Sequence, residues 1–295
     1  MRDFRFGFTL ASHGSQRELV RTCATAEAYG FDIAVAVDHL GTGRAGPLPT
    51  AMAAALATER MRVGTYVLDI GFWNAWMLAR DVVTVQRLSG GRFELGLGTG
   101  IVKAQFDAAG IPWQPYPERV ERLRATIDEL RQLMDAEADF SPPPLLVGGS
   151  AERTLRLAAE RADIVSFGGR LQVPGQPPGT LRIISADEAD ERVALFTAAA
   201  GDRAGELERN AFVLDVEVTD DPRAAAERVA AEDPGHLSAE ELMASPFVLL
   251  GTEEQIARKL LDSRERYGFS SFYVQRPHMP VLGPVIKQVR SLAGG

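Results

Sequence analysis

The sequence predicts an α/β fold, a single (β/α)8 barrel over residues 1–295. Short apolar β-type runs alternate with longer helical patterns along the chain, and eight such pairs can be counted. A doubly wound open sheet is the alternative. No Gly-x-Gly-x-x-Gly motif follows the first strand, which removes support for the dinucleotide-binding form of that sheet. The length of 295 residues fits two small domains or one barrel, and the strict alternation favours the barrel.

The expected elements follow in order along the chain. Strands are expected at Phe4–Thr9, Ile33–Val37, Arg62–Asp69, Phe93–Gly98, Leu145–Gly148, Ile164–Phe167, Phe212–Val218 and Ser271–Val274. Helices are expected at Gln16–Tyr29, Thr50–Thr58, Ala75–Leu88, Pro117–Met134, Ala151–Arg161, Ala186–Ala200, Pro222–Glu232, Glu253–Tyr267 and Val285–Leu292.

Local start and stop signals support several of these helices. Ser15, Ser185 and Thr252 each precede a helical pattern with Glu or Gln three residues later, the spacing of a capping box. Gly30 and Gly268 each follow a helical pattern, at the position where a left-handed residue ends a helix.

Composition narrows the class of protein. The chain is 45% hydrophobic and 24% charged, which is typical of a globular domain. Its net charge of −8 argues against non-specific nucleic-acid binding, which needs a basic surface. The single cysteine, Cys23, forms no internal disulfide, and no stretch of about 18 apolar residues or signal peptide is visible. We therefore expect a cytoplasmic protein that binds neither membrane nor nucleic acid.

Polar residues and glycines follow the expected strands, at the barrel rim where chemistry is expected. They are Asp38, His39, Gly98, Thr99, Gly100, Gly148, Gly149, Ser150, Arg170, Arg276 and His278, with His13 as a further histidine near a strand end. Asp38-His39 is either a proton-transferring pair or a histidine bonded to local backbone. Gly148-Gly149-Ser150 is either a phosphate-binding turn or a tight turn with Ser150 as helix N-cap.

Three more features have two interpretations each. The alternate glycines of Gly96–Gly100 indicate close approach by a flat cofactor ring or by a neighbouring helix. Trp73, with Phe72 and Trp76, either forms the wall of a substrate pocket or belongs to the core. The proline-rich segment Gly168–Gly179 is either a lid or a passive connector. No metal-ligand spacing and no nucleophile elbow occur, so neither metal nor covalent serine catalysis is expected.

A family resemblance is visible in several sequence blocks. The block Leu88–Gly100, LSGGRFELGLGTG, resembles the bacterial luciferase-like flavin and deazaflavin oxidoreductases, as do Asp38-His39-Leu40, Arg62–Thr65, Pro144–Ala162 and Gly251–Tyr267 in the expected order. The resemblance implies a luciferase-like TIM barrel that binds FMN or coenzyme F420 at its C-terminal rim. The short region Met134–Pro142 is similar to the compact F420-dependent subgroup. Ile101 stands where sugar-phosphate-oxidising members have an acid.

The resemblance also implies residue roles. Tyr66 and Val67 would back the ring at a bulge with a non-proline cis peptide, Gly98, Thr99 and Gly100 would line the ring, and His39 would lie beside its reactive carbon. Gly148, Gly149 and Ser150, with Arg170 nearby, would hold the cofactor phosphate.

The function expected is therefore an F420-dependent oxidoreductase that reduces a C=N or C=C bond of a small molecule. In this hypothesis His39 donates the proton, Asp38 orients His39, and Trp73, Arg276 and His278 contact the substrate. The alternatives are an FMN-dependent luciferase-like monooxygenase, a non-catalytic flavin-binding protein and a phosphate-binding barrel unrelated to flavins. A homodimer is implied by the family.

Overall fold

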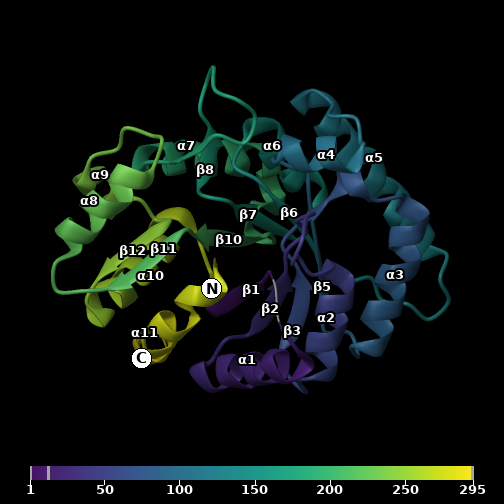
Figure 1. Ribbon diagram of the computed structural model, residues 1–295, viewed down its shortest axis with the longest axis horizontal. Coiled ribbons are helices and arrows are strands. Elements are labelled where there is room, and N and C mark those ends of the chain that lie inside the picture. Colours follow the sequence, from purple (N-terminus) through teal and green to yellow (C-terminus); the bar gives the residue numbers. More distant parts are fainter. Residues whose placement is uncertain (1, 12–13, 294–295) are drawn as a thin grey trace.

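Eight parallel strands close into a barrel with helices outside it, as predicted (Figure 1). The computed structural model describes residues 2–11 and 14–293, so His13 lies outside the described residues. The barrel strands are β1 (Arg5–Leu10), β2 (Ile33–Ala36), β3 (Arg62–Thr65), β5 (Phe93–Gly98), β6 (Leu145–Gly148), β7 (Ile164–Phe167), β10 (Glu208–Val213) and β13 (Ser271–Val274). Pairing of β1 with β13 and of β3 with β5 completes the ring.

Helices cover the outside of the barrel. They are α1 (Gln16–Tyr29), α2 (Pro47–Leu56), α3 (Ala75–Leu88), α5 (Tyr116–Asp135), α6 (Glu152–Arg161), α7 (Ala186–Ala200), α10 (Glu253–Tyr267) and α11 (Met279–Ala293). The capping boxes at Ser185 and Thr252 form in full, and Gly30 and Gly268 end α1 and α10 with φ of 92° and 74°. Ser15 makes only the side-chain half of its box, because the Glu18 carboxylate bonds Gly14 and Arg276 instead.

The third strand is interrupted. The expected run Arg62–Asp69 divides into β3 and β4 (Leu68–Asp69), with a cis peptide between Tyr66 and Val67. Strand β4 pairs with β5, and the short helix η1 (Ile70–Phe72) follows it directly. The bulge turns the chain at the C-terminal rim of the barrel.

The seventh strand was misplaced in the sequence prediction. The barrel strand β10 begins four residues before the expected Phe212, because buried polar residues interrupt its apolar pattern. Glu208 pairs with Arg5, and Asn210 bonds Ser166 and Ser271 across neighbouring strands. The chain then leaves the barrel, and β11 (Asp215–Val218) pairs with β12 (Val248–Gly251), a strand that was not predicted.

Two helices start earlier than the sequence predicts. Helix α2 starts with Pro47 at its first position rather than at Thr50, and α11 starts at Met279 rather than Val285. The prediction missed α4 (Lys103–Ala109), α9 (Ala239–Ala244) and the short helices η2 (Gly201–Gly205) and η3 (Arg276–His278), while α8 (Pro222–Glu232) was predicted. None of the helices in the described ranges is both long and apolar enough to cross a membrane.

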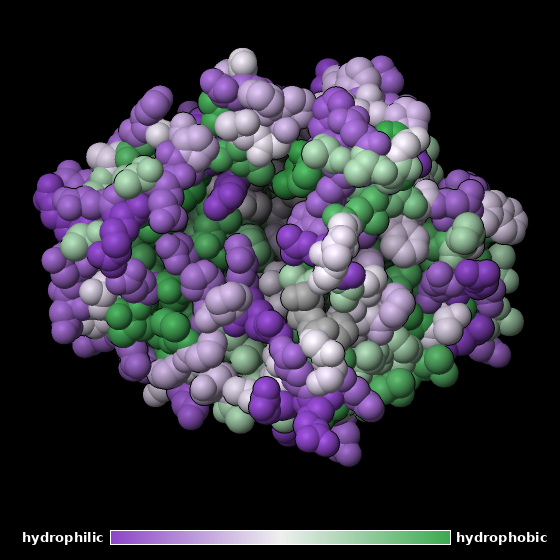
Figure 2. All heavy atoms as spheres, in the orientation of Figure 1, coloured by the Kyte–Doolittle hydropathy of each residue, from purple (hydrophilic) through white to green (hydrophobic). Residues whose placement is uncertain are grey.

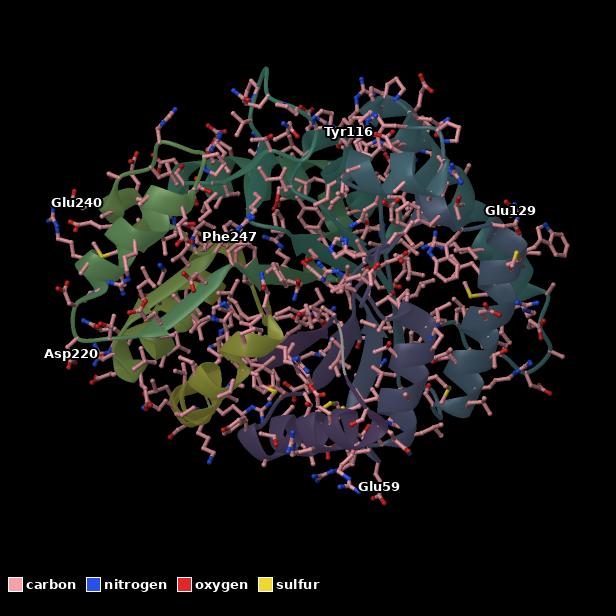
Figure 3. All side chains as sticks on the ribbon, viewed as in Figure 1. Glu59, Tyr116, Glu129, Asp220, Glu240 and Phe247 are labelled. Carbon is pink, nitrogen blue, oxygen red and sulfur yellow. The ribbon has the colours of Figure 1, made fainter. Side chains whose placement is uncertain are left out.

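The small unit of β11, β12, α8 and α9 lies beside the barrel at the left of Figure 1. Phe247, labelled in Figure 3, anchors it, because its buried ring packs on Phe269 and closely approaches Gly169. The barrel interior holds a separate cluster of Ile33, Val35, Leu146, Ile164 and Tyr273. This packed interior leaves the C-terminal rim as the open end of the barrel.

The segment after β7 is partly ordered into a hairpin. Strands β8 (Arg170–Gln172) and β9 (Leu181–Ile183) pair antiparallel, and their connecting loop projects at the top of Figure 1. The Gln172 side chain bonds four backbone groups of that loop, which gives the proline-rich connection a defined shape.

Candidate functional site

A cavity of about 860 Å³ opens at the C-terminal ends of the barrel strands. Figure 2 shows the hollow at the centre of this face. The hairpin of β8 and β9 contributes Arg170, Leu171, Gln172 and Leu181 to its lining, and the connecting loop adds Gly179, which closely approaches the Ile101 carbonyl. The segment Gly168–Gly179 therefore covers part of the cavity.

Eleven of the fourteen residues predicted for the site line this cavity. They are Asp38, His39, Tyr66, Val67, Gly98, Thr99, Gly100, Gly148, Gly149, Ser150 and Arg170. The structure thus brings together residues from five separate strand ends. Their individual roles remain predictions.

The three residues predicted to contact substrate do not line the cavity. Trp73 donates its indole N–H to Asp38 at 2.7 Å, Arg276 pairs with Glu18 at 3.1 Å, and His278 faces Asp215 at 3.8 Å. Each of these side chains lies beside a carboxylate from another part of the chain. The position of a residue after a strand does not predict such a pairing.

The expected aromatic wall does not form either. Phe72 packs on Phe106 with ring centroids 4.8 Å apart, and Trp76 is 67% exposed on the surface of α3. The aromatic residues that do line the cavity are Tyr66, Trp113, Tyr116 and Phe212. Trp113 and Tyr116 come from the α4–α5 connection and the start of α5, so they follow no strand and their place at the rim could not be predicted from strand ends.

The glycine turn before α6 places a buried serine hydroxyl at the cavity. The α6 N-cap is Ala151, so Ser150 is not the capping residue of the simpler interpretation. The Ser150 hydroxyl is buried and has no hydrogen-bond partner among the described residues. Buried polar groups are nearly always bonded, so an unpaired hydroxyl at a helix N-terminus on a cavity indicates a place for an anionic ligand group.

Tyr116 supports this turn from the neighbouring helix. Its hydroxyl accepts the Thr154 backbone N–H at 3.2 Å and bonds the Thr154 side chain at 2.9 Å. Figure 3 labels Tyr116 at the start of α5. Gly149 has φ of 149°, and an added Cβ there would lie 2.9 Å from Thr154. The fixed first turn of α6 leaves its earlier N–H groups available to a ligand.

The alternate glycines of β5 accommodate the third strand rather than a helix. An added Cβ at Gly96 would lie 2.0 Å from the Thr65 carbonyl oxygen, and one at Gly98 would lie 2.5 Å from Val67. A Cβ added at Gly148 would also lie close to Val67, at 3.1 Å. The bulge therefore lies against β5 and β6 and forms part of the cavity surface.

Asp38 and His39 have different hydrogen-bond partners, so no direct hydrogen bond by which Asp38 would orient His39 is seen among the described residues. Asp38 is 8% exposed and accepts hydrogen bonds from Trp73 and from the Asp69 backbone N–H. Burial raises its pKa, and the two hydrogen bonds oppose that shift. The His39 charge also lowers the Asp38 pKa, so the two groups interact through their charges but share no hydrogen bond in the described part of the chain.

Gln105 takes the expected place of Asp38 beside the imidazole. Its Oε1 accepts the Leu40 backbone N–H at 3.2 Å, and its Nε2 lies 3.3 Å from His39 Nδ1. Gln105 Oε1 lies 3.5 Å from the same Nδ1, so the amide can donate to the neutral ring or accept the Nδ1–H of the protonated ring.

Two further polar residues at the cavity were not predicted. Burial raises the pKa of Asp69 to about 6. Arg119 donates to the carbonyls of Thr99 and Gly100, and its guanidinium lies 3.9 Å from the centre of the Trp113 ring. Asp69 stands at a strand end and could have been singled out there, whereas Arg119 on α5 carried no sequence signal.

Residues 4–271 match the family model described as luciferase-like monooxygenase. The chain belongs to this family. That result confirms the resemblance seen in the sequence, and the closed barrel confirms the predicted fold.

The names of the curated relatives mention two kinds of cofactor. The F420-dependent glucose-6-phosphate dehydrogenase of Intrasporangium calvum is 38% identical over 130 residues, which cover 41% of this chain and 39% of the relative. The FMNH2-dependent dimethylsulfone monooxygenase of Pseudomonas putida is 28% identical over 198 residues, covering 60% and 51%. The chain thus spans about two fifths to one half of the length of these relatives. Both are enzymes, so this is an enzyme family.

Solved structures share the fold over nearly the whole chain. An F420-dependent secondary alcohol dehydrogenase aligns with a TM-score of 0.74 and 15% identity, covering 98% of this chain and 100% of that one.

Proposed function

We propose that this protein is an F420-dependent oxidoreductase that reduces a C=N or C=C bond of a small molecule. The observation that carries the proposal is one cavity that holds both the turn at Ser150 and the imidazole of His39. An anion-binding turn and a proton-transferring side chain are what a phosphate-bearing hydride donor requires from its protein.

The residues of the cavity fit such a cofactor. The partnerless Ser150 hydroxyl and the first turn of α6 suit its phosphate, and Arg170 adds a positive charge at the same cavity. Val67 and Gly98 offer a small apolar surface to a flat ring. When bound, the reduced deazaflavin supplies a hydride from a ring carbon.

His39 supplies the accompanying proton in this proposal. Reduction of a C=N or C=C bond adds a hydride to one atom and a proton to the other. In the protonated imidazolium, Nδ1–H can donate to Gln105 Oε1, 3.5 Å away, while Nε2–H gives its proton to the substrate. The neutral ring left behind then takes a proton from solvent. Gln105 is thereby the residue that positions the imidazole.

The substrate class follows from the cavity lining. Ile101, Val102, Leu171 and Leu214 line the cavity, which suits a partly apolar small molecule. Ile101 is 51% exposed where the sugar-phosphate-oxidising relatives have an acid, which disfavours glucose 6-phosphate as substrate.

An FMN-dependent monooxygenase is the second candidate. The similarity to the dimethylsulfone monooxygenase favours it, because the turn at Ser150 would hold the phosphate of either cofactor. Reduced FMN activates dioxygen, whereas the deazaflavin reacts poorly with it.

A side-by-side titration of the apoprotein with F420 and FMN tests the proposal. Micromolar binding of F420 with little affinity for FMN is expected, followed by turnover of imines or enones without oxygen consumption. Preference for FMN together with oxygen consumption would establish the monooxygenase instead. Tight binding of either cofactor without turnover across the substrate panel would favour a non-catalytic flavin-binding protein, and binding of neither would favour an unrelated phosphate-binding barrel.

The homodimer implied by the family and the expected cytoplasmic location are part of the same proposal. Light scattering coupled to size-exclusion chromatography tests the first, and fractionation of the source cells tests the second.

A further inference from the structure

Asp69 is a buried carboxyl group at the cavity that the proposed hydride transfer does not use. It follows the Tyr66–Val67 bulge at the end of β4, lines the cavity and is only 7% exposed. Its Oδ1 accepts the Gly71 backbone N–H at 3.0 Å. No donor among residues 2–11 and 14–293 bonds its Oδ2, so this oxygen remains available to a ligand.

Because Gly100 has no side chain, there is room beside it for Asp69 Oδ2. A Cβ added at Gly100 would lie 2.1 Å from Oδ2, far inside van der Waals contact. The glycine also has φ of 76°, a conformation that side chains with Cβ rarely adopt. The loop after β5 is therefore shaped around the Asp69 carboxyl group.

The charged groups around Asp69 do not offset the effect of burial on its pKa. Asp38, which lies after β2 and precedes His39, adds a second acid, and its Oδ2 accepts the Asp69 backbone N–H at 3.1 Å. From α5, Arg119 bonds the carbonyls of Thr99 and Gly100, and Arg122 bonds the Gly71 carbonyl. These arginines lower the pKa of Asp69 only in part, because their donors are directed to carbonyl oxygens.

Burial is the dominant influence, and the Asp38 charge acts in the same direction. Together they raise the Asp69 pKa to about 6. A planar ligand over the cavity would remove the remaining water and favour the neutral acid further. A carboxylic acid kept neutral in this way donates a hydrogen bond instead of accepting one.

We propose that Asp69 binds the cofactor ring as a neutral carboxylic acid, donating a hydrogen bond from Oδ2 to a carbonyl oxygen or ring nitrogen. Flavin and deazaflavin rings both present such acceptors, so the inference holds for either cofactor. It rests on the proposed function only in taking the ligand to be one of these rings. Ring binding is then coupled to uptake of one proton from solvent by Asp69.

The coupling predicts a pH-dependent affinity. If only the protonated form of Asp69 binds the ring, the dissociation constant rises about tenfold per pH unit above the Asp69 pKa of about 6 in the cofactor-free protein. The loss between pH 6 and pH 8 is then about 50-fold. Ionisation of the cofactor itself also changes affinity, so the comparison must be made between variants at each pH.

Asp69→Asn provides the decisive variant, because an amide is a permanent neutral donor of nearly the same shape. Its Oδ1 can still accept the Gly71 N–H that begins η1. We measure the dissociation constants of F420 and FMN from pH 5.5 to pH 8.5 for the wild type, Asp69→Asn and Asp69→Ala. The expected result is that Asp69→Asn binds more tightly than the wild type at pH 8, and that Asp69→Ala binds weakly throughout. Asp107→Asn, an exposed aspartate on α4, is the matched control and should follow the wild type.

Parallel pH profiles for the wild type and Asp69→Asn would overturn the inference. If the variant does not fold, a carbon-13 NMR titration of the wild-type aspartate carboxyls decides instead. One carboxyl group should titrate near pH 6 in the free protein and stay protonated when the ring is bound, whereas ordinary titration of every aspartate would refute the proposal. Preference for FMN over F420 would change the proposed function and leave this test unaffected.

Discussion

Replacing Ser150 with alanine should stabilise the protein without ligand and weaken its binding of a phosphate-bearing cofactor. The Ser150 hydroxyl is buried without a partner among the described residues. Such a group costs about 1–3 kcal/mol relative to its hydrated state, and the alanine variant removes that cost. We expect the free energy of unfolding to rise by about 1–2 kcal/mol, or roughly 2–4 °C in Tm.

The same hydroxyl is expected to donate to an anionic phosphate oxygen when the cofactor binds. A hydrogen bond to a charged group contributes about 1.5–3 kcal/mol, so Ser150→Ala should lose about 10-fold to 100-fold in cofactor affinity. The two effects have opposite signs, which separates a binding role from simple packing.

Ser245→Ala is the matched control. Ser245 is also fully buried, but its hydroxyl donates to the Ile184 carbonyl at 2.9 Å, away from the cavity lining. The Ser245→Ala substitution should lower the free energy of unfolding by about 1 kcal/mol and leave cofactor affinity unchanged. Thermal unfolding with and without cofactor measures both variants. A destabilised Ser150→Ala protein that binds the cofactor normally would refute the anion-binding interpretation.

Three other predictions follow from the same geometry. His39→Ala should slow turnover about 10²-fold to 10⁴-fold with little change in cofactor affinity, measured by steady-state kinetics and titration; unchanged turnover would remove it from the mechanism. Gly100→Ala should be less stable than Gly110→Ala by denaturant unfolding, because both glycines have left-handed φ but only Gly100 faces a nearby group, Asp69; equal losses would disprove that clash. Because the folded-state pKa of Asp69 is raised from 3.8 to about 6, its ionisation costs stability as pH rises through this window, so Asp69→Asn should gain roughly 2–3 kcal/mol over the wild type at pH 7.5 and little at pH 4. Equal stability differences at both pH values would contradict the raised pKa.

Much of the cavity could be predicted because barrel topology brings strand ends together. Residues that directly follow a strand, such as His39, Thr99 and Ser150, line the cavity once the alternation of elements is recognised. Trp73 and His278 also follow strands but do not line the cavity. Their side chains turn to Asp38 and Asp215, and side-chain direction in a loop depends on partners distant in the sequence.

Local pattern also decided the helix ends and most of the strands. The complete capping box at Ser185 and the left-handed Gly268 could be read from the sequence, because the groups that satisfy a helix end lie within one turn of it. Strand β10 was misplaced because Asn210 is polar yet buried, and only its bonds to neighbouring strands make that burial tolerable.

The sequence by itself determined the alternating elements, the closed barrel, the family and the rim on which the cavity lies. Only the tertiary structure decided that Asp38 is held by Trp73, that Gln105 holds His39, and that Asp69 lies buried with one oxygen unpartnered among the described residues. The physical reason is the distance along the sequence over which the deciding interactions act. Helix and strand patterns arise from neighbours within a few residues, whereas the protonation and orientation of a side chain depend on burial and on partners about 30 to 70 residues away.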